Sequence, residues 1–204
     1  MPSRRSAVLL AAALFGFALV CWAGVAGLGL LPADARTAQE VAEERVGGLG
    51  LALPRVLAFL GSPVPAAIWT AGLAVAVGRW LGRRYGALVL AASGVFVITS
   101  VIKVLADRTR PAAGVGLDPS FPSGHTAYVT AVLGLMVVLL AQRQRWGLAA
   151  AAGLVVVAMG PSRVLLGVHW LSDVLAGYAI GLAWLLLILA FGLPWARRGA
   201  GPGG

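Results

Sequence analysis

The chain has 204 residues, of which 60% are hydrophobic and only 11% are charged. Soluble domains carry about 25% charged residues, so this composition excludes an ordinary soluble protein and favours one embedded in a membrane. The net charge is +9, but the arginines stand in short clusters between apolar runs instead of forming one basic face with interleaved aromatic residues, which argues against nucleic-acid binding.

Six uncharged runs divide the chain. Each approaches the length of about 17 to 25 residues that crosses the hydrocarbon core of a bilayer as a helix. The sequence therefore predicts an all-α protein, a six-transmembrane-helix bundle that forms a single membrane-embedded domain over residues 1–204. The predicted spans are residues 7–31, 56–78, 85–102, 126–142, 146–162 and 174–196.

The first run follows two arginines, as the apolar part of a cleaved signal peptide would. It is longer than the about 7 to 15 apolar residues of such a peptide, so a retained first span is favoured over cleavage. Residues 34–45 are then polar and helix-favouring and stop before Gly47 and Gly48. They predict a short surface helix at the membrane interface, with a solvated connector as the alternative. Pro63 and Pro65 lie inside the second run and should kink or shorten its helix.

Charged residues are divided unequally between the two sides of the predicted bundle. All seven acidic residues fall on one side together with seven basic ones, whereas the other side carries only arginines. Because connections rich in Lys and Arg stay in the cytoplasm, both termini are expected there and the short surface helix is expected outside the cell. The arginines of the cytoplasmic side are Arg4, Arg5, Arg79, Arg83, Arg84, Arg143, Arg145, Arg197 and Arg198.

Three polar motifs stand where apolar runs begin or end, all on the side expected to face outward. Together they hold the only lysine and both histidines of the chain, within residues 103–173. The motifs are Lys103-x6-Arg110-Pro111, Pro122-Ser123-Gly124-His125 and Ser162-Arg163-x5-His169-x3-Asp173.

The first two motifs suit an anion. Lys103 and Arg110 are seven residues apart, which is about two helical turns, so both are expected on one side of a helix before Pro111 interrupts it. Alone, such cations are typical of side chains that reach lipid headgroups. Ser123 is expected to cap the fourth span, whose first N–H groups then face an anion, and Gly124 allows that anion to approach the backbone closely.

The third motif suggests a nucleophile. His169 and Asp173 have the i, i+4 spacing that places two side chains on one helical face, where the carboxylate can hold one ring nitrogen and leave the other unprotonated. Alone, Asp173 fits an ordinary acid at a helix N-terminus equally well, and a lone His125 would be structural. With Arg163, the motifs bring three positive charges together, which favours binding of a phosphoryl group. The acids are dispersed, so no metal and no cofactor are expected.

In this order the three motifs resemble the signature of the type 2 phosphatidic acid phosphatase superfamily, integral-membrane lipid phosphatases that act without a metal. The resemblance implies that His169 attacks phosphorus and forms a phosphohistidine while Asp173 orients its ring. It also implies that His125 is the general acid, which protonates the leaving oxygen and then helps to activate water. The positions that match phosphate-binding residues of the family are Lys103, Arg110, Ser123, Gly124 and Arg163.

Three charged residues within or beside these motifs match no signature position, namely Asp107, Arg108 and Asp118. They are expected to be local helix and turn residues. The connector of residues 112–121 is short for the family, which implies a small and weakly selective lid over the leaving group.

The expected function is a metal-independent lipid phosphatase of a bacterial plasma (inner) membrane, with its site on the extracytoplasmic side. Candidate substrates are undecaprenyl diphosphate, which the outward site slightly favours, phosphatidylglycerophosphate and phosphatidic acid, reached through a lateral gap near Lys103 and His169. A lipid phosphotransferase with an acceptor other than water stays open, and a transporter or lipid-binding scaffold is a remoter alternative. Vanadium haloperoxidases share the family's phosphate site, but a chain of six apolar spans does not resemble those soluble enzymes.

Overall fold

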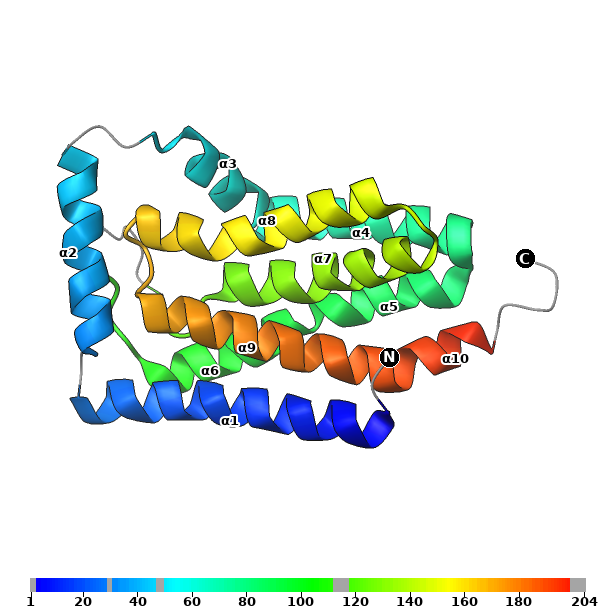
Figure 1. Ribbon diagram of the computed structural model, residues 1–204, viewed down its shortest axis with the longest axis horizontal. Helices are drawn as coiled ribbons and strands as arrows, with labels where there is room; N and C mark the ends of the chain where they lie inside the picture. The colour runs from blue at the N-terminus through cyan, green and yellow to red at the C-terminus, as the bar shows by residue number, and fades with distance from the viewer. Residues whose placement is uncertain (1–2, 29–30, 47–49, 112–117, 199–204) are drawn as a thin grey trace.

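The computed structural model describes residues 3–28, 31–46, 50–111 and 118–198, and the regular elements of these residues are all helical (Figure 1). The elements are α1 (Arg4–Leu28), α2 (Pro32–Val46), α3 (Ala52–Leu60), α4 (Pro63–Leu81), α5 (Arg83–Ser93), α6 (Val95–Ala106), α7 (Gly124–Gln142), α8 (Trp146–Leu165), α9 (Leu171–Leu187), the π-helical turn η1 (Ile188–Gly192) and α10 (Leu193–Arg197).

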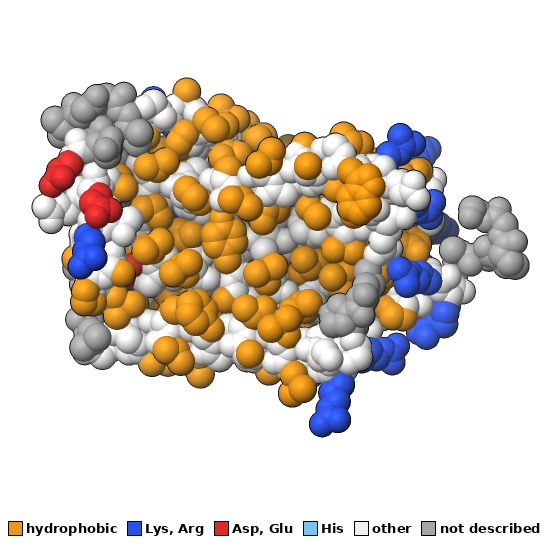
Figure 2. All heavy atoms as spheres, in the orientation of Figure 1, with side chains coloured by type: hydrophobic (Ala, Val, Ile, Leu, Met, Phe, Trp, Pro, Cys, Tyr) orange, Lys and Arg blue, Asp and Glu red, His pale blue; other side chains and the backbone are white. Residues whose placement is uncertain are grey.

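Six helical stretches among the described residues are long and apolar enough to cross a membrane. Hydrophobic side chains cover much of the molecular face in Figure 2, where a soluble protein would carry polar ones. The predicted all-α architecture of six spans is therefore confirmed. The six stretches are Arg4–Gly27, Pro63–Leu81, Arg83–Ala106, Gly124–Gln142, Trp146–Leu165 and Leu171–Arg197.

The second predicted span differs most from the structure. Residues 56–78 do not form one helix, because α3 ends at Leu60 and α4 begins at Pro63. Proline fits the first turn of a helix, where its missing N–H has no intrahelical partner. Of the two expected effects, Pro63 therefore shortens the helical part of the predicted span by starting α4, and it does not kink a longer helix. The predicted third span is also divided, since α5 and α6 meet at Gly94, but the two helices together still form one stretch.

Helix α7 lies at the centre of the bundle and packs against α5, α6, α8 and α9. Two glycines let α9 approach it closely: a Cβ at Gly177 would lie 2.7 Å from Ser123 O, and one at Gly181 would lie 2.6 Å from Ala127 O. Small residues at a helix interface permit such contact between backbones in a membrane. The approach brings the N-terminal ends of α7 and α9 together, and Ser123 N donates to Asp173 O at 2.9 Å.

The two ends of the bundle differ. Helix α2 lies across one end, and α1 begins and α10 ends at the other (Figure 1). Figure 2 shows Lys and Arg side chains gathered at the end opposite α2. At that end the side chain of Arg4 donates to Ala190 O at 3.2 Å, which holds the start of α1 against η1. Residues 34–45, predicted as a short surface helix, lie within α2.

Candidate active site

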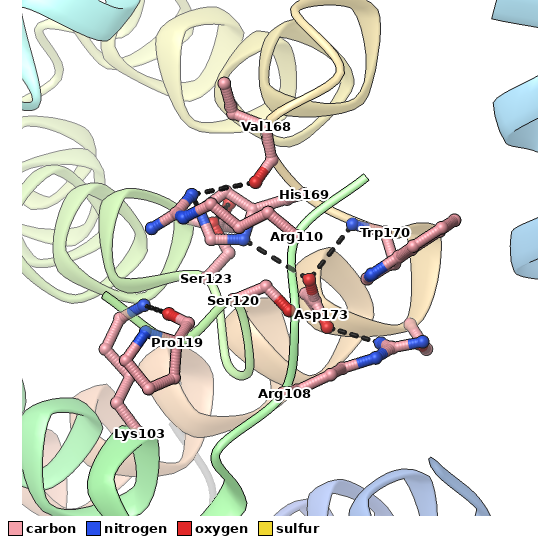
Figure 3. Close-up of polar contacts among 12 residues, drawn as sticks. Lys103, Arg108, Arg110, Pro119, Ser120, Ser123, Val168, His169, Trp170 and Asp173 are labelled. Carbon is pink, nitrogen blue, oxygen red and sulfur yellow. Dashed lines mark hydrogen bonds and ion pairs between the residues drawn. The ribbon is translucent and has the colours of Figure 1, made fainter. Parts of the chain in front are cut away.

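The three motifs come together at the end of the bundle that α2 crosses (Figure 3). Lys103 lies in the last turn of α6, Ser123 precedes α7, Arg163 lies in the last turn of α8, and His169 precedes α9. The motif residues between positions 103 and 173 thus converge because four helices end or begin at one level.

His169 and Asp173 are both buried, with 3% and 0% of their surface exposed. His169 Nδ1 lies 3.4 Å from Asp173 Oδ2. The other ring nitrogen, Nε2, lies 3.4 Å from Arg110 Nη1. A guanidinium can only donate, so Nε2 is the accepting nitrogen and Nδ1 carries the proton that faces the carboxylate. This tautomer leaves a lone pair on Nε2.

The spacing of His169 and Asp173 predicted that they share one helical face, but in the structure they do not. Helix α9 begins at Leu171, so His169 lies in the loop before it. The contact has another cause: Asp173 Oδ2 accepts from Trp170 N at 3.0 Å and so caps the helix. A carboxylate in the first turn folds back over the residues before the helix, and this brings it next to His169. Capping and orientation of the histidine are therefore both done by one side chain.

The surroundings of His169 keep its ring neutral. The pKa of His169 is lowered from the usual 6.5 to about 4: burial is the largest cause, the positive charges of Arg163 and Arg110 act in the same direction, and Asp173 opposes them. A charged imidazolium loses hydration when it is buried, which the carboxylate only partly offsets. At neutral pH the side chain is therefore an unprotonated base.

Lys103 and Arg110 lie close together, but they do not lie on one helix, which the sequence had predicted. Helix α6 ends at Ala106 because Asp107 adopts the left-handed conformation, with φ of 41°. Both cations instead reach Asp118: Arg110 Nη2 lies 2.8 Å and Lys103 Nζ 3.4 Å from Asp118 Oδ2. Lys103 Nζ also donates to Pro119 O, and Arg110 Nη1 donates to Val168 O at 2.7 Å.

Asp118 is therefore more than the turn residue that was expected. Its side chain is 62% exposed, yet it stands between the two cations. Burial of the carboxylate acts to raise the pKa of Asp118, but the charges of Lys103 and Arg110 outweigh it and hold that pKa below its usual value. An ionised carboxylate thus lies between Lys103 and Arg110, the two cations that the sequence predicts to bind an anion.

Ser123 and Gly124 lie beside these cations. Ser123 is the N-cap residue of α7 as predicted, although its side chain makes no capping hydrogen bond. Its Oγ accepts from Thr126 Oγ1 at 3.0 Å. A Cβ at Gly124 would lie 3.9 Å from Lys103 Cε, so the lysine stem passes next to the start of α7. The positive end of that helix adds to the charge of the lysine.

His125 is half-buried in the first turn of α7 and faces a different element. Its Nε2 lies 3.2 Å from Ala58 O, in the last turn of α3. The sequence identified His125 as a candidate acid but gave no indication of this partner, which is 67 residues away.

Arg163 lacks partners in an unusual way. It is only 7% exposed, and its Nε and Nη1 have no hydrogen-bond partner among the described residues. An unsatisfied buried charged donor is unfavourable. The donors of Arg163 are therefore available to an anionic ligand.

Arg108, expected to be a local helix or turn residue, is a buried part of the site. Its Nη1 donates to Asp173 Oδ1 at 2.5 Å and to Ser172 Oγ at 2.8 Å, and its Nη2 donates to Asp34 Oδ2 at 2.7 Å. Its guanidinium also lies 5.3 Å from the centre of the Trp170 ring. The prediction for Arg108 was wrong because its partners come from α2 and α9, which the local sequence does not reveal.

Asp34 completes this network and was likewise missed. It is 1% exposed and accepts from Ser172 N at 2.8 Å and from Ser172 Oγ at 2.6 Å. One carboxylate thereby ties the first turn of α2 to the first turn of α9. The only signal in the sequence is a charge beside an apolar segment, where an unpaired carboxylate would be unfavourable.

A cavity of about 370 Å³ lies between α2 and the loop that carries His169. Its lining includes Thr37 and Val41 of α2, Val164 of α8, and His169 and Trp170. No group of three or more His, Cys, Asp or Glu side chains that could hold a metal ion occurs among the described residues. Residues 112–117 of the predicted lid lie outside the described residues.

The chain is similar to several known proteins. The sequence profile of the PAP2 superfamily matches residues 83–196. The chain is 31% identical over 104 residues to phosphatidylglycerophosphatase B of Bacillus subtilis (strain 168), covering 47% of this chain and 51% of the relative. It is 40% identical over 114 residues to decaprenylphosphoryl-5-phosphoribose phosphatase of Mycobacterium tuberculosis (strain CDC 1551 / Oshkosh), covering 50% and 59%.

A third relative is lipid A 1-phosphatase of Rhizobium johnstonii, 40% identical over 89 residues, with 44% of this chain and 33% of the relative covered. The chain therefore spans about half the length of the first two curated relatives and less of the third. A crystal structure of a transmembrane PAP2 type phosphatidylglycerolphosphate phosphatase from Bacillus subtilis matches with a TM-score of 0.69 and 25% identity, over 95% of this chain and 98% of that one.

Proposed function

Because this chain belongs to the PAP2 superfamily, we propose that it is an integral-membrane phosphatase that hydrolyses a phosphate ester or diphosphate of a lipid. The observation that carries the proposal is a neutral His169 whose pKa is lowered by the nearby charge of Arg163, together with the buried Nε and Nη1 of Arg163, which have no partner among the described residues. A nucleophile beside unsatisfied cationic donors suits a phosphoryl group. The relatives are named as phosphatases of three different lipids.

The proposed reaction proceeds in two steps. His169 Nε2 attacks phosphorus, so that a P–N bond forms while the P–O bond to the lipid breaks, and His125 gives a proton to the leaving oxygen. A water molecule, deprotonated by His125, then attacks the phosphohistidine and releases inorganic phosphate. Asp173 holds the Nδ1–H of His169 at 3.4 Å and stabilises the positive charge that the ring acquires.

The phosphate is held by Lys103, Arg110, Arg163 and the Ser123–Gly124 turn at the start of α7. These groups stabilise the charge on the equatorial oxygens of the transition state, the part that electrostatics plays in phosphoryl transfer. Asp118 must leave Lys103 and Arg110 as the phosphate arrives, since like charges repel. The positive charge comes from side chains of this chain, and we propose that no metal ion takes part.

We also propose how the protein sits in the membrane. The arginine-rich end faces the cytoplasm with both termini, because positive connections are retained there. The active site and α2 then lie at the extracytoplasmic surface of the plasma (inner) membrane, with α2 along the interface. The lipid reaches the site laterally, through a gap between spans near Lys103 and His169, and residues 1–204 act as one domain.

The substrate is a lipid whose tails stay in the bilayer. Undecaprenyl diphosphate is one candidate, because an outward-facing site meets that carrier where it is released. Phosphatidylglycerophosphate and phosphatidic acid are the others, and the name of the Bacillus subtilis relative supports the former.

The test is phosphate release from these three lipids by purified, EDTA-treated protein in detergent, with His169→Ala as the inactive variant. We expect metal-free release that this variant loses while it still elutes as a folded protein. Acid-stable incorporation of the phosphoryl group into added glycerol would instead identify a phosphotransferase. Release that His169→Ala retains, or that EDTA removes, would contradict the mechanism.

A further inference from the structure

The junction between α3 and α4 contacts His125 at two points. Ala58 O lies 3.2 Å from His125 Nε2. Gly61, the residue after α3, is buried against the same ring: a Cβ placed there would lie 2.5 Å from His125 Cδ2. The junction therefore supplies both a hydrogen-bond acceptor and a surface that fits the imidazole without space for a methyl group.

Ala58 O is free to accept from the histidine because the end of α3 leaves it without a backbone partner among the residues that the structure describes. The last carbonyls of a helix have no intrahelical donors and carry its partial negative charge. The other carbonyls of this turn are bonded elsewhere: Leu57 O accepts from Gly61 N at 2.9 Å, Phe59 O from Ser62 N at 3.1 Å, and Leu60 O from Trp69 Nε1 at 2.9 Å.

The position of α3 is fixed by packing. Leu57, which precedes Ala58, is buried in a cluster with Val129 of α7 and Met159 of α8. These two helices also carry His125 and Arg163. The carbonyl of Ala58 is thus held by the same helices that build the site.

We propose that the α3–α4 junction is a positioning element for the general acid, acting through Ala58 O and Gly61. A carbonyl can only accept, so Ala58 O selects the tautomer of His125 in which Nε2 carries the proton. Nδ1 is then the atom that exchanges protons with the substrate. This inference rests on the proposed function only for the direction of proton transfer, because the tautomer is a property of the resting protein.

The proton balance is simple. In the resting protein the neutral ring holds its Nε2–H on Ala58 O. When the phosphorylated lipid binds, Nδ1 takes up one proton from water, and the cationic ring then presents this Nδ1–H to the leaving oxygen. As the P–O bond breaks, the Nδ1 proton passes to that oxygen, and the neutral ring keeps its Nε2–H on Ala58 O. In the second step Nδ1 accepts a proton from the attacking water, and release of this proton to the solvent with the inorganic phosphate returns the ring to its neutral resting form. The carbonyl also stabilises the charged ring at the negative end of a helix.

Gly61→Ala isolates this role. Gly61 has φ of −85° and ψ of −4°, a right-handed conformation that alanine adopts without strain. The nearest obstacle to its methyl group is the His125 ring, so we expect the protein to fold and the ring to move. Gly72→Ala in α4 is the matched control, because a Cβ there would meet nothing within 4 Å.

The first measurement is the ring ¹⁵N spectrum of histidine-labelled protein in detergent. The chain has only two histidines, so the signals are assigned with a single His169→Ala sample. We expect neutral His125 in the Nε2–H form in the wild type and in Gly72→Ala, and a shifted or mixed form in Gly61→Ala, with the His169 signals unchanged. A wild-type His125 in the Nδ1–H form, or identical spectra for the wild type and Gly61→Ala, would overturn the proposal.

The second measurement compares leaving groups. The alkoxide of a lipid needs a proton to leave, whereas p-nitrophenolate leaves without one. General acid catalysis contributes about 10²- to 10⁴-fold, so partial displacement of the ring should lower kcat/KM for the lipid by about 10- to 100-fold. With p-nitrophenyl phosphate as substrate we expect Gly61→Ala to change kcat/KM by less than about twofold. Equal losses on both substrates would show a merely structural effect and would contradict the positioning role.

The two proposals fail in different ways. If the wild type releases no phosphate from any lipid but shows the Nε2–H form of His125 with the expected response to Gly61→Ala, the proposed function fails and the positioning of the ring stands. If the wild type is a His169-dependent phosphatase and Gly61→Ala behaves as Gly72→Ala does in both measurements, the positioning inference alone fails.

Discussion

Two buried arginines of the site have opposite surroundings. Arg108 and Arg163 are each 7% exposed. Arg108 donates to Asp34, Ser172 and Asp173, so its charge is neutralised inside the protein. Arg163 keeps Nε and Nη1 without partners among the described residues.

The difference separates two kinds of positive charge. The region around Arg108 is a closed network in which α2 and α9 are tied to the residue that orients His169. The region around Arg163, Lys103 and Arg110 has an excess of donors, partly occupied by Asp118. A buried charge with counter-charges inside the protein contributes to the structure, whereas a buried charge without a partner is suited to binding a ligand of opposite charge. Mutations in the two regions should therefore affect stability and binding separately.

The largest effect is expected from Arg108→Met. Removing one partner of a buried ion pair leaves Asp34 and Asp173 without their counter-charge, which costs about 3–5 kcal/mol and should lower Tm by about 6–20 °C. Thermal unfolding in detergent measures it. Arg36→Met in α2, an exposed arginine at the same end, serves as the control with little change. A variant of Arg108 as stable as the wild type would show that the network does not hold α2 to α9.

Arg163→Met should have the opposite effect on stability: activity should fall while Tm does not. Loss of a donor to the transition-state oxygens lowers kcat/KM by about 10²- to 10³-fold, while Tm stays the same or rises, because an uncompensated buried charge is removed. Activity, Tm and stabilisation by orthovanadate, a phosphate analogue, are the readouts. Arg145→Met, at the exposed start of α8, should match the wild type in all three. A large fall in Tm for Arg163→Met would show that Arg163, like Arg108, stabilises the fold.

The titration of His169 also tests the difference between the two regions, because its ring contacts Asp173 of the Arg108 network and its pKa responds to the charge of Arg163. Burial lowers the pKa of its ring to about 4 from the ordinary 6.5. The ring ¹⁵N signals of His169 should therefore keep their neutral values as the pH falls through 6.5 and change only near pH 4. Because the charge of Arg163 also lowers this pKa, Arg163→Met should raise it. A midpoint near 6.5 in the wild type would mean that water reaches the ring.

The smallest effect is expected from Asp118→Asn. Under the proposed mechanism the carboxylate competes with phosphate for Lys103 and Arg110, but it is exposed, and exposed ion pairs contribute only about 0.2–1 kcal/mol. Inhibition by orthovanadate should become about two- to fivefold tighter. Asp107→Asn is the matched control, since asparagine also accepts the left-handed conformation at that position. Weaker inhibition in Asp118→Asn would show that Asp118 assists phosphate binding instead of competing with it.

Much of the fold and of the site follows from local sequence patterns. Lengths and hydropathy of the apolar runs indicate the six spans, and the positions of the motifs at the ends of these runs indicate that Lys103, Ser123, Arg163 and His169 lie at one end of the bundle. These features are local, because a helix of sufficient apolar length must cross the bilayer whatever it packs against. The left-handed Asp107 that ends α6, and the loop position of His169, were missed, since helix termini depend on a few competing contacts.

What only the tertiary structure decided are the partners of the charged and titratable side chains. Arg108 meets Asp34 across 74 residues and Asp173 across 65, and His125 meets Ala58 across 67. No periodicity records such pairs, because they depend on which helix ends pack together and at what depth. The sequence by itself indicated which residues are candidates for the chemistry; the packing of α2, α3 and α9 decided which of their donors are occupied and which have no partner among the described residues.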